Sequence, residues 1–202
     1  MNQELLNTIN QFKEEKISNE RKETLIPLIQ YIQLKRSKNE TIRLNFICTH
    51  NSRRSHLAQI WAQTMSAYFG LKNVQSYSGG TDVTAINPKV LETLTLQGFS
   101  IDCISKNENS IYAIKYNENE VPIICFSKQY HHDFNPKSDY AAILTCNSAD
   151  DACPVVFGAD VRIPIKYDDP KVHDGTDIAN QKYSERSLEI GNEMWWVFSQ
   201  IK

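Results

Sequence analysis

The segment from Cys48 to Ser55, with the sequence CTHNSRRS, places a thiol six positions before an arginine and seven before a serine. It follows the apolar run RLNFIC and precedes SHLAQIWAQTMSAYF, in which apolar residues recur at helical spacing as far as Gly70. A loop between a strand and a helix N-terminus directs successive backbone N–H groups at an anion, and the helix dipole adds to the attraction. The pattern predicts an oxyanion-binding loop made of Thr49, His50, Asn51, Ser52, Arg53, Arg54 and Ser55.

Cys48 is the candidate nucleophile of this loop. The positive environment favours the thiolate form, and the hydroxyl of Ser55 can donate to the sulfur. Arg54 can place two parallel donors on the remaining oxygens of a bound anion. Asn51 is a residue type that tolerates the left-handed backbone needed when all amides of a loop point inward.

The elements around the loop alternate between strands and helices. Residues 73–78 predict a strand that runs into two glycines, and a helix follows that is capped by Asn87 and ends at Gly98. The segment YAAILTC predicts a buried strand ending at Cys146. Such alternation predicts an α/β fold with a doubly wound parallel sheet, and the ligand site then lies at the carboxyl ends of the strands. Because Cys48 and Cys146 both end strands, we expect them at the same edge.

Other segments complete the predicted organisation. Residues 110–116 and 121–127 predict an inserted strand pair, VRIPI a short strand, and residues 178–201 a closing helix. Residues 1–38 read as two helices that form an N-terminal helical appendage, and residues 41–202 as the catalytic domain.

Composition narrows the class of protein. The formal charge is −2 with scattered basic residues, which argues against nucleic-acid binding. The N-terminus lacks an apolar run long enough for a signal peptide or a membrane span, so we expect a cytosolic protein whose five cysteines are reduced. Cys103 and Cys125 are expected to be buried apolar residues. No metal site is expected, because the consecutive His131, His132 and Asp133 read as a solvated turn.

The motif C-x5-R-S after a strand resembles the signature of the low-molecular-weight protein tyrosine phosphatase superfamily. Within it, the chain looks like the thioredoxin-coupled arsenate reductases, because CTHNSRRS is similar to their CTGNSCRS, and YSGGTDVTAINPKVLE and TCNSADDACP resemble two further segments. The resemblance implies a flavodoxin-like sheet of four parallel strands, Cys48 as nucleophile, Arg54 as oxyanion ligand and Asp169 as general acid. Asp168 is the neighbouring candidate for the acid.

The resemblance also implies roles for two more cysteines. Cys146 would attack Cys48 to release arsenite and leave a disulfide between Cys48 and Cys146. Cys153 would then attack Cys146, and the resulting disulfide between Cys146 and Cys153 could be reached by an external thioredoxin-like reductant. No bound cofactor is expected. A disulfide needs α-carbons closer than about 7 Å, whereas seven helical residues span about 10.5 Å, so the polar and poorly helical segment 147–152 would have to refold.

The chain departs from the related families at several positions. Arg53 stands where they usually carry cysteine or another uncharged residue, and His50 where they usually carry glycine; either could strengthen anion binding or crowd an aryl phosphate. Gln59 replaces a glutamate that helps hold potassium in the arsenate reductases, which argues against a cation site. The aromatic residues that grip a phosphotyrosine ring after Asp-Pro are missing, since the sequence reads KVHD.

The leading hypothesis is a thiol-dependent arsenate reductase. A phosphomonoester hydrolase working through a phosphocysteine is the first alternative, and a non-catalytic oxyanion-binding module the second. Cys146 and Cys153 separate the two enzymes, because only a reductase needs electrons from a dithiol. The expected ligand is an arsenate-like or phosphate-like oxyanion or a phosphorylated substrate; the sequence specifies no oligomeric state.

Overall fold

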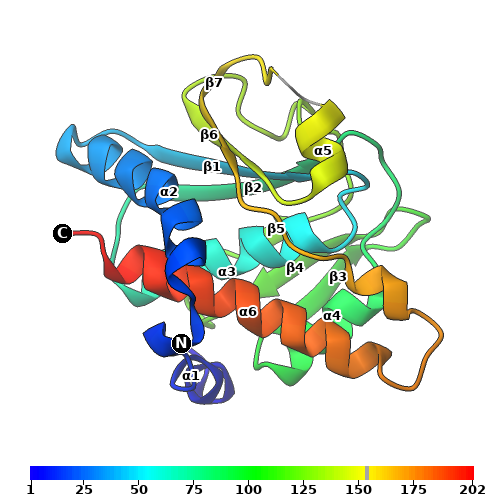
Figure 1. The fold of residues 1–202 in the computed structure, drawn as a ribbon. Coiled ribbons are helices and arrows are strands. Elements are labelled where there is room, and N and C mark those ends of the chain that lie inside the picture. Colours follow the sequence, from blue (N-terminus) through cyan, green and yellow to red (C-terminus); the bar gives the residue numbers. More distant parts are fainter. Residues whose placement is uncertain (153–154) are drawn as a thin grey trace.

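The structure, a computed structural model, describes the backbone of residues 1–152 and 155–202 and their side chains apart from those of residues 150–152. Figure 1 shows the arrangement of the elements. In chain order they are α1 (Gln3–Ile9), η1 (Glu14–Lys16), α2 (Asn19–Ser37), β1 (Ile42–Cys48), α3 (Arg54–Tyr68), β2 (Val74–Gly80), α4 (Pro88–Leu96), β3 (Ser100–Ser105), β4 (Ile111–Lys115), β5 (Ile123–Cys125), β6 (Tyr140–Leu144), α5 (Asn147–Ala152), β7 (Ala159–Pro164), η2 (Pro170–His173) and α6 (Ala179–Ser199).

The central element is a four-stranded sheet in the order β2-β1-β6-β7, with every neighbouring pair parallel. Six of the seven residues of β1 and all five of β6 are buried, as expected for inner strands covered on both faces. Pairing runs to Cys48 opposite Gly80 and to Ile47 opposite Leu144. The predicted doubly wound parallel sheet is confirmed, and the loop after β1 leaves it at the carboxyl edge.

Helices α3, α4 and α6 lie together on one side of this sheet (Figure 1). Helix α3 is buried over most of its surface because it packs against β1 and β2 on one side and α6 on the other. Trp61 at its centre meets Phe12 and Phe99 edge to face, with ring centroids 5.3 and 5.1 Å apart, and its indole N–H donates to Ser187 at 2.9 Å. The helix that begins at the candidate loop is therefore fixed on all sides.

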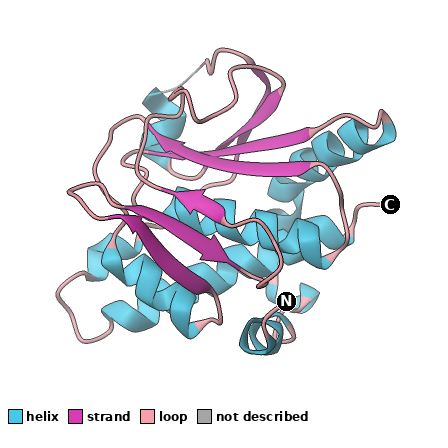
Figure 2. Ribbon diagram, turned by 180° about the vertical axis from the view of Figure 1, so that it is seen from behind, coloured by secondary structure: helices cyan, strands magenta, loops and turns pink. Residues whose placement is uncertain are grey.

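A second, antiparallel sheet has the order β3-β4-β5, and Figure 2 brings it to the front. Its β4 and β5 confirm the predicted strand pair. The sequence analysis missed β3, whose residues are mostly exposed and so show no buried face. Cys103 lies on this edge strand and is exposed, so its predicted burial is wrong, whereas Cys125 is buried as predicted.

The N-terminal segment forms the two predicted helices, with η1 between them. Its apolar side chains belong to the same hydrophobic cluster as those of the central sheet and α6; they are Leu5, Ile9, Phe12, Ile17, Leu25, Leu28, Tyr31 and Ile32. The division between residues 1–38 and 41–202 stays a prediction, and the two parts share one core. Among the described residues, no helix combines the length and apolar character needed to cross a bilayer.

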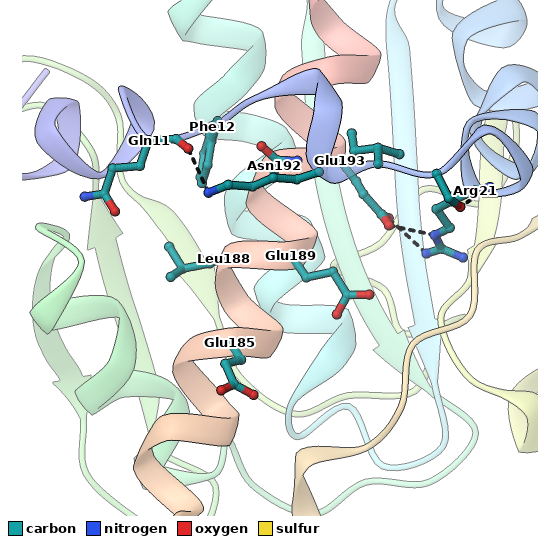
Figure 3. Close-up of a pocket in the computed structure, with 11 residues that line it drawn as sticks. Gln11, Phe12, Arg21, Glu185, Leu188, Glu189, Asn192 and Glu193 are labelled. Carbon is teal, nitrogen blue, oxygen red and sulfur yellow. Dashed lines mark hydrogen bonds and ion pairs between the residues drawn. The ribbon is translucent and has the colours of Figure 1, made fainter.

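Figure 3 shows the contact between the N-terminal segment and α6, which borders a cavity of about 580 Å³. Arg21 donates two hydrogen bonds to the carboxylate of Glu193, at 2.6 and 2.9 Å, and Asn192 pairs with the backbone N–H and C=O of Lys13. Glu193 is almost fully buried and also accepts from the hydroxyl of Tyr167 at 2.7 Å. Arg21 thus supplies the cation for a buried carboxylate.

We predict that Arg21→Met lowers the free energy of unfolding by about 3 kcal/mol, because it leaves the charge of Glu193 buried without its cation. The matched control is Lys22→Met, whose partner Glu14 has a side chain that is 55% exposed; its loss should stay below about 1 kcal/mol. Urea unfolding of the three proteins measures both values. Equal losses in the two variants would contradict this account of how the segment is held.

Candidate functional site

The loop after β1 turns its carbonyl groups away from its own centre. The carbonyl of Thr49 accepts from the N–H of Asp82 at 2.8 Å, and that of Ser52 accepts from the N–H of Asn87 at 3.0 Å. The carbonyl of His50 accepts from the hydroxyls of Ser127 and Thr84, at 2.9 and 3.2 Å. In the described part of the chain, the N–H groups of residues 49–53 have no protein acceptor. Amides left free in this way are what an oxyanion-binding loop requires.

Asn51 organises the centre of the loop. Its backbone is left-handed, with φ of 44°, as the sequence analysis predicted. Its side-chain amide donates to the Ser55 hydroxyl at 2.9 Å, and the Ser55 oxygen lies 3.1 Å from the sulfur of Cys48. Because the amide N–H occupies a lone pair of the serine oxygen, the serine proton is free to point at the sulfur. This chain of contacts places a hydroxyl donor beside the sulfur of Cys48.

His56, in the first turn of α3, supports the loop through the carbonyl of Asn51. The sequence analysis did not identify this residue. Its ring is fully buried between the carbonyl of Asn51, 2.9 Å from Nε2, and the hydroxyl of Ser78, 3.2 Å from Nδ1. Burial lowers its pKa to about 3, with the charge of Lys128 adding to the effect. The ring is therefore neutral at physiological pH, and Nε2–H donates to the loop carbonyl.

Lys128 is a second supporting residue that sequence reasoning missed. Its backbone N–H donates to the side-chain oxygen of Asn51 at 2.9 Å. Its ammonium is buried, lies 4.5 Å from the ring centroid of Phe126 and 5.4 Å from that of Phe134, and burial lowers its pKa to about 8. No local pattern marks such a lysine, because its role depends on a contact 77 positions away.

Gly80, at the end of β2, approaches the loop so closely that a β-carbon there would lie 2.5 Å from the carbonyl oxygen of Thr49 and 2.7 Å from the N–H nitrogen of Asn51. Only glycine leaves room for the loop at this point. The close approach of the loop therefore explains why the second predicted strand ends in glycine at position 80.

Arg54 and Asp169 face one another across the site. Arg54 Nη2 donates to Asp169 Oδ2 at 2.6 Å, and Nη1 donates to the carbonyl of Tyr167 at 3.0 Å. Arg54 Nε is buried and has no partner among the described residues. Asp168 pairs instead with Arg186 at 3.4 Å, and its side chain is 98% exposed. Of the two adjacent aspartates, the structure brings Asp169 to the loop.

Cys146 lies beside the loop, as its position after a neighbouring strand predicted. Its sulfur is 3.4 Å from the hydroxyl of Thr49 and accepts from the N–H of Ala149 at 3.3 Å. Both Cys48 and Cys146 are buried in one small hydrophobic cluster. The predicted poorly helical segment 147–152 forms the short helix α5, because the sulfur of Cys146 caps its first turn. Cys153 lies outside the described residues.

A cavity of about 460 Å³ opens over the loop. Its lining residues are Thr49, His50, Arg54, Cys146, Asn147, Ser148, Lys166, Tyr167, Asp168, Asp169 and Lys171. This set holds three basic side chains and two carboxylates, so its formal charge is slightly positive, which favours an anion. Cys48 itself is buried, with 3% of its surface exposed.

Other candidates from the sequence lie elsewhere. The guanidinium of Arg53 donates to Tyr183 and Asp174, so this residue offers the anion its backbone. The side-chain amide of Gln59 donates to the carbonyl of Ser76 at 3.1 Å. His131, His132 and Asp133 are exposed; Asp133 pairs with Lys137. Among the described residues, no three His, Cys, Asp or Glu side chains gather around a common point as metal ligands would.

Comparisons with known proteins show which families the chain is similar to. The family model described as low molecular weight phosphotyrosine protein phosphatase matches residues 43–132. The chain is 27% identical to arsenate reductase 2 of Staphylococcus haemolyticus over 55% of this chain and 65% of the relative, a little under two thirds of that protein's length. It is 25% identical to the arsenate reductase of Halalkalibacterium halodurans over 78% of this chain and 84% of the relative.

The fold also has solved counterparts. The low molecular weight protein tyrosine phosphatase from T. tengcongensis superposes with a TM-score of 0.53 and 16% identity, covering 76% of this chain and 95% of that one. The family model, which matches a little under half of the chain, and the two relatives show that the chain is similar to the low-molecular-weight protein tyrosine phosphatases and to arsenate reductases. The solved structure shows that it shares their fold.

We predict that iodoacetamide at pH 6 alkylates Cys48 before Cys103, although Cys103 is exposed and Cys48 is buried, because the Ser55 hydroxyl and the amides of the loop surround the Cys48 sulfur with hydrogen-bond donors. Burial raises the pKa of Cys125 to about 12, so that thiol should stay unlabelled. Mass spectrometry of the labelled peptides measures the order, and phosphate should protect Cys48 alone. Labelling of Cys103 first would disprove the assignment.

The pKa of His56 predicts how stability depends on pH. Above pH 6.5 neither the folded nor the unfolded chain protonates this ring; between pH 6.5 and about 3 only the unfolded chain does. The free energy of unfolding should therefore fall as the pH is lowered through this window, by at most about 1.4 kcal/mol per pH unit from this group. His56→Gln should flatten the slope between pH 6 and 4.

The control for this measurement is His131→Gln, at a solvent-exposed histidine. Thermal unfolding across the pH series compares the three proteins. The interpretation of His56 fails if its variant keeps the slope of the parent, or if the control flattens the slope equally.

Proposed function

We propose that the protein is a thiol-dependent arsenate reductase in which Cys48 attacks arsenate, Arg54 binds the oxyanion, Asp169 is the general acid and Cys146 is the second thiol. The observation that carries the proposal is the position of Cys146: its sulfur lies buried beside the loop, 3.4 Å from the hydroxyl of the residue next to Cys48. Hydrolysis of a phosphate ester needs one thiol, whereas reduction of arsenate needs two electrons from a pair of thiols.

The first step joins arsenate to Cys48. Arsenate accepts hydrogen bonds from the free amides of the loop and from Arg54. Arg54 then turns away from Asp169, and the carboxyl group of Asp169 faces the bound oxyanion. The thiolate of Cys48 attacks arsenic, an S–As bond forms and an As–O bond breaks. Asp169 supplies the proton with which the departing oxygen leaves as water, a contribution typically worth about 10² to 10⁴ in rate.

The second step reduces arsenic. The thiolate of Cys146 attacks the sulfur of Cys48, so that an S–S bond forms and the S–As bond breaks. The electron pair of the broken bond stays on arsenic, which passes from As(V) to As(III) and leaves as arsenite. Two thiols have become one disulfide, and the two electrons balance.

Return to the dithiol state completes the proposal. Cys153, seven positions after Cys146 in the sequence, attacks Cys146 and releases Cys48 as a thiol. An external dithiol protein of the thioredoxin type then reduces the Cys146 to Cys153 disulfide. A cytosolic location, with its reducing thiol pool, suits this cycle. The two relatives named arsenate reductases support this activity.

Phosphomonoester hydrolysis is the second candidate, because Cys48, Arg54 and Asp169 are sufficient for it and the matching family model describes a phosphotyrosine phosphatase. The segment after Asp169 argues against an aryl phosphate as the preferred substrate. It offers Pro170, Lys171 and an exposed Val172 where an aromatic grip on a phenyl ring would be expected.

We predict that Cys146→Ser abolishes multiple-turnover arsenate reduction and changes aryl phosphate hydrolysis by less than about threefold, because the nucleophile, Arg54 and Asp169 remain. Cys48→Ser should abolish both reactions. Cys103→Ser, at an exposed thiol on the far sheet, is the matched control and should leave both unchanged. The assay follows arsenite formation with a thioredoxin system and, on the same preparations, release of 4-nitrophenol. If Cys146→Ser reduces arsenate at the parent's rate, the proposed reductase is wrong.

A further inference from the structure

Two consecutive arginines of the oxyanion loop reach the two ends of one short segment. Arg54 pairs with Asp169 at 2.6 Å, at the start of the segment, and Arg53 pairs with Asp174 at 3.1 Å, at its end. Between these aspartates lies η2. The first aspartate is the proposed general acid, so the segment that carries the acid is held to the loop at two points.

The contact at Asp174 is a closed set of three side chains. Arg53 Nε donates to the hydroxyl of Tyr183 at 2.6 Å, that hydroxyl donates to Asp174 Oδ1 at 2.8 Å, and Arg53 Nη2 donates to Asp174 Oδ2 at 3.1 Å. Tyr183 is fully buried in α6, and burial raises its pKa to about 12, so its hydroxyl keeps its proton at neutral pH. None of these bonds uses a group that the anion needs.

The contact at Asp169 is different, because it competes with the ligand. Arg54 already uses one N–H of each terminal nitrogen, on the carbonyl of Tyr167 and on Asp169, so a guanidinium that turns to face an oxyanion weakens its bond to Asp169. Binding of the anion therefore weakens one of the two ion pairs between the segment and the loop at the moment when its acid is needed. The local bonds that remain at Asp169 are those to the N–H of Lys171 at 3.0 Å and of Val172 at 3.4 Å.

We propose that Arg53, through Tyr183 and Asp174, is a positioning residue that keeps the segment 169–174 over the site when Arg54 moves from Asp169 to the bound oxyanion. The proposal rests on the proposed function, since it requires an oxyanion on the loop. The proposal explains why this chain has arginine at position 53, where the related loop CTGNSCRS has cysteine. It also separates the two arginines: Arg54 touches the substrate, and Arg53 acts through the segment that carries Asp169.

Hydrogen–deuterium exchange with inorganic phosphate as the probe tests the positioning role directly. In the parent, phosphate should slow exchange in residues 49–55 and leave exchange in residues 170–174 unchanged. In Arg53→Met, phosphate should raise exchange in residues 170–174 several-fold, because both ion pairs that tie the segment to the loop are then weakened or lost and only its contact with Tyr183 of α6 remains on that side. Without phosphate, the Arg54 to Asp169 pair still holds the segment, and the variant should differ little from the parent.

The matched control is Arg186→Met, an arginine of α6 whose side chain is also mostly buried and ion-paired, here with Asp168 and Glu189. It should behave as the parent with and without phosphate. Asp174→Asn and Tyr183→Phe change the far side of the contact and leave the loop sequence intact, so they serve if Arg53→Met does not fold; each should show a smaller phosphate-dependent rise.

Turnover gives a second readout. Arg53→Met should lower kcat for arsenate reduction by about 10- to 100-fold with little change in KM, because displacement of a reacting group by about 1 Å can cost about 10² in rate. The loss should be smaller for 4-nitrophenyl phosphate, whose leaving group needs less protonation. Arg186→Met should stay within about twofold of the parent on both substrates.

The outcomes separate the two proposals. If phosphate fails to slow exchange in residues 49–55 of the parent, the oxyanion function fails, and the role of Arg53 fails with it. If phosphate protects the loop but Arg53→Met raises exchange in residues 170–174 equally with and without phosphate, Arg53 only stabilises the fold and the positioning role is overturned. A KM effect without a kcat effect would overturn it in the same way.

Discussion

The outward hydrogen bonding of the carbonyls in the loop after β1 is the constraint on which the site depends. Amides can converge on an anion only if each carbonyl of the same peptide units is satisfied elsewhere, because an unpaired buried carbonyl is costly. The donors come from four places: the turn after β2, the start of α4, Ser127 beyond β5, and His56 in α3. The smaller sheet therefore belongs to the site as well as to the fold, since it delivers Ser127 and the backbone N–H of Lys128.

The sequence predicted the central fold well because its signals are local and periodic. The strand, loop and helix from β1 to α3, the capped helix α4 and the buried strand β6 each carry their pattern within about 15 residues. Strand β3 was missed because its side chains are mostly exposed and because, among the described residues, it pairs with β4 alone. Helix α5 was judged poorly helical from its composition, and propensity was overridden by a cap from the sulfur of Cys146.

The candidate site divides in the same way. Cys48, Arg54 and Asp169 were readable because a nucleophile, an anion ligand and an acid have characteristic neighbours in sequence. His56, Lys128 and Tyr183 were not, because each acts through contacts that only folding creates; Tyr183 meets Arg53 across 130 positions. Arg53 shows the limit most clearly. A positive charge in an anion loop suggests contact with the anion, yet the geometry directs its guanidinium to Asp174, 121 positions later.

The docking of the N-terminal segment on α6 has a consequence for how the chain is made. Arg21 is hydrogen-bonded to Glu193, and Lys13 to Asn192; these partners are 172 and 179 residues apart in the sequence. On the ribosome, the first helices to emerge cannot make these contacts until α6 has been synthesised, and contacts of this separation slow folding. Glu193 in turn holds the hydroxyl of Tyr167, whose carbonyl accepts from Arg54. Arg54 thus acquires its complete surroundings only after α6 has been synthesised, so a nascent chain that has already exposed Cys48 passes through a period in which the candidate site is incomplete.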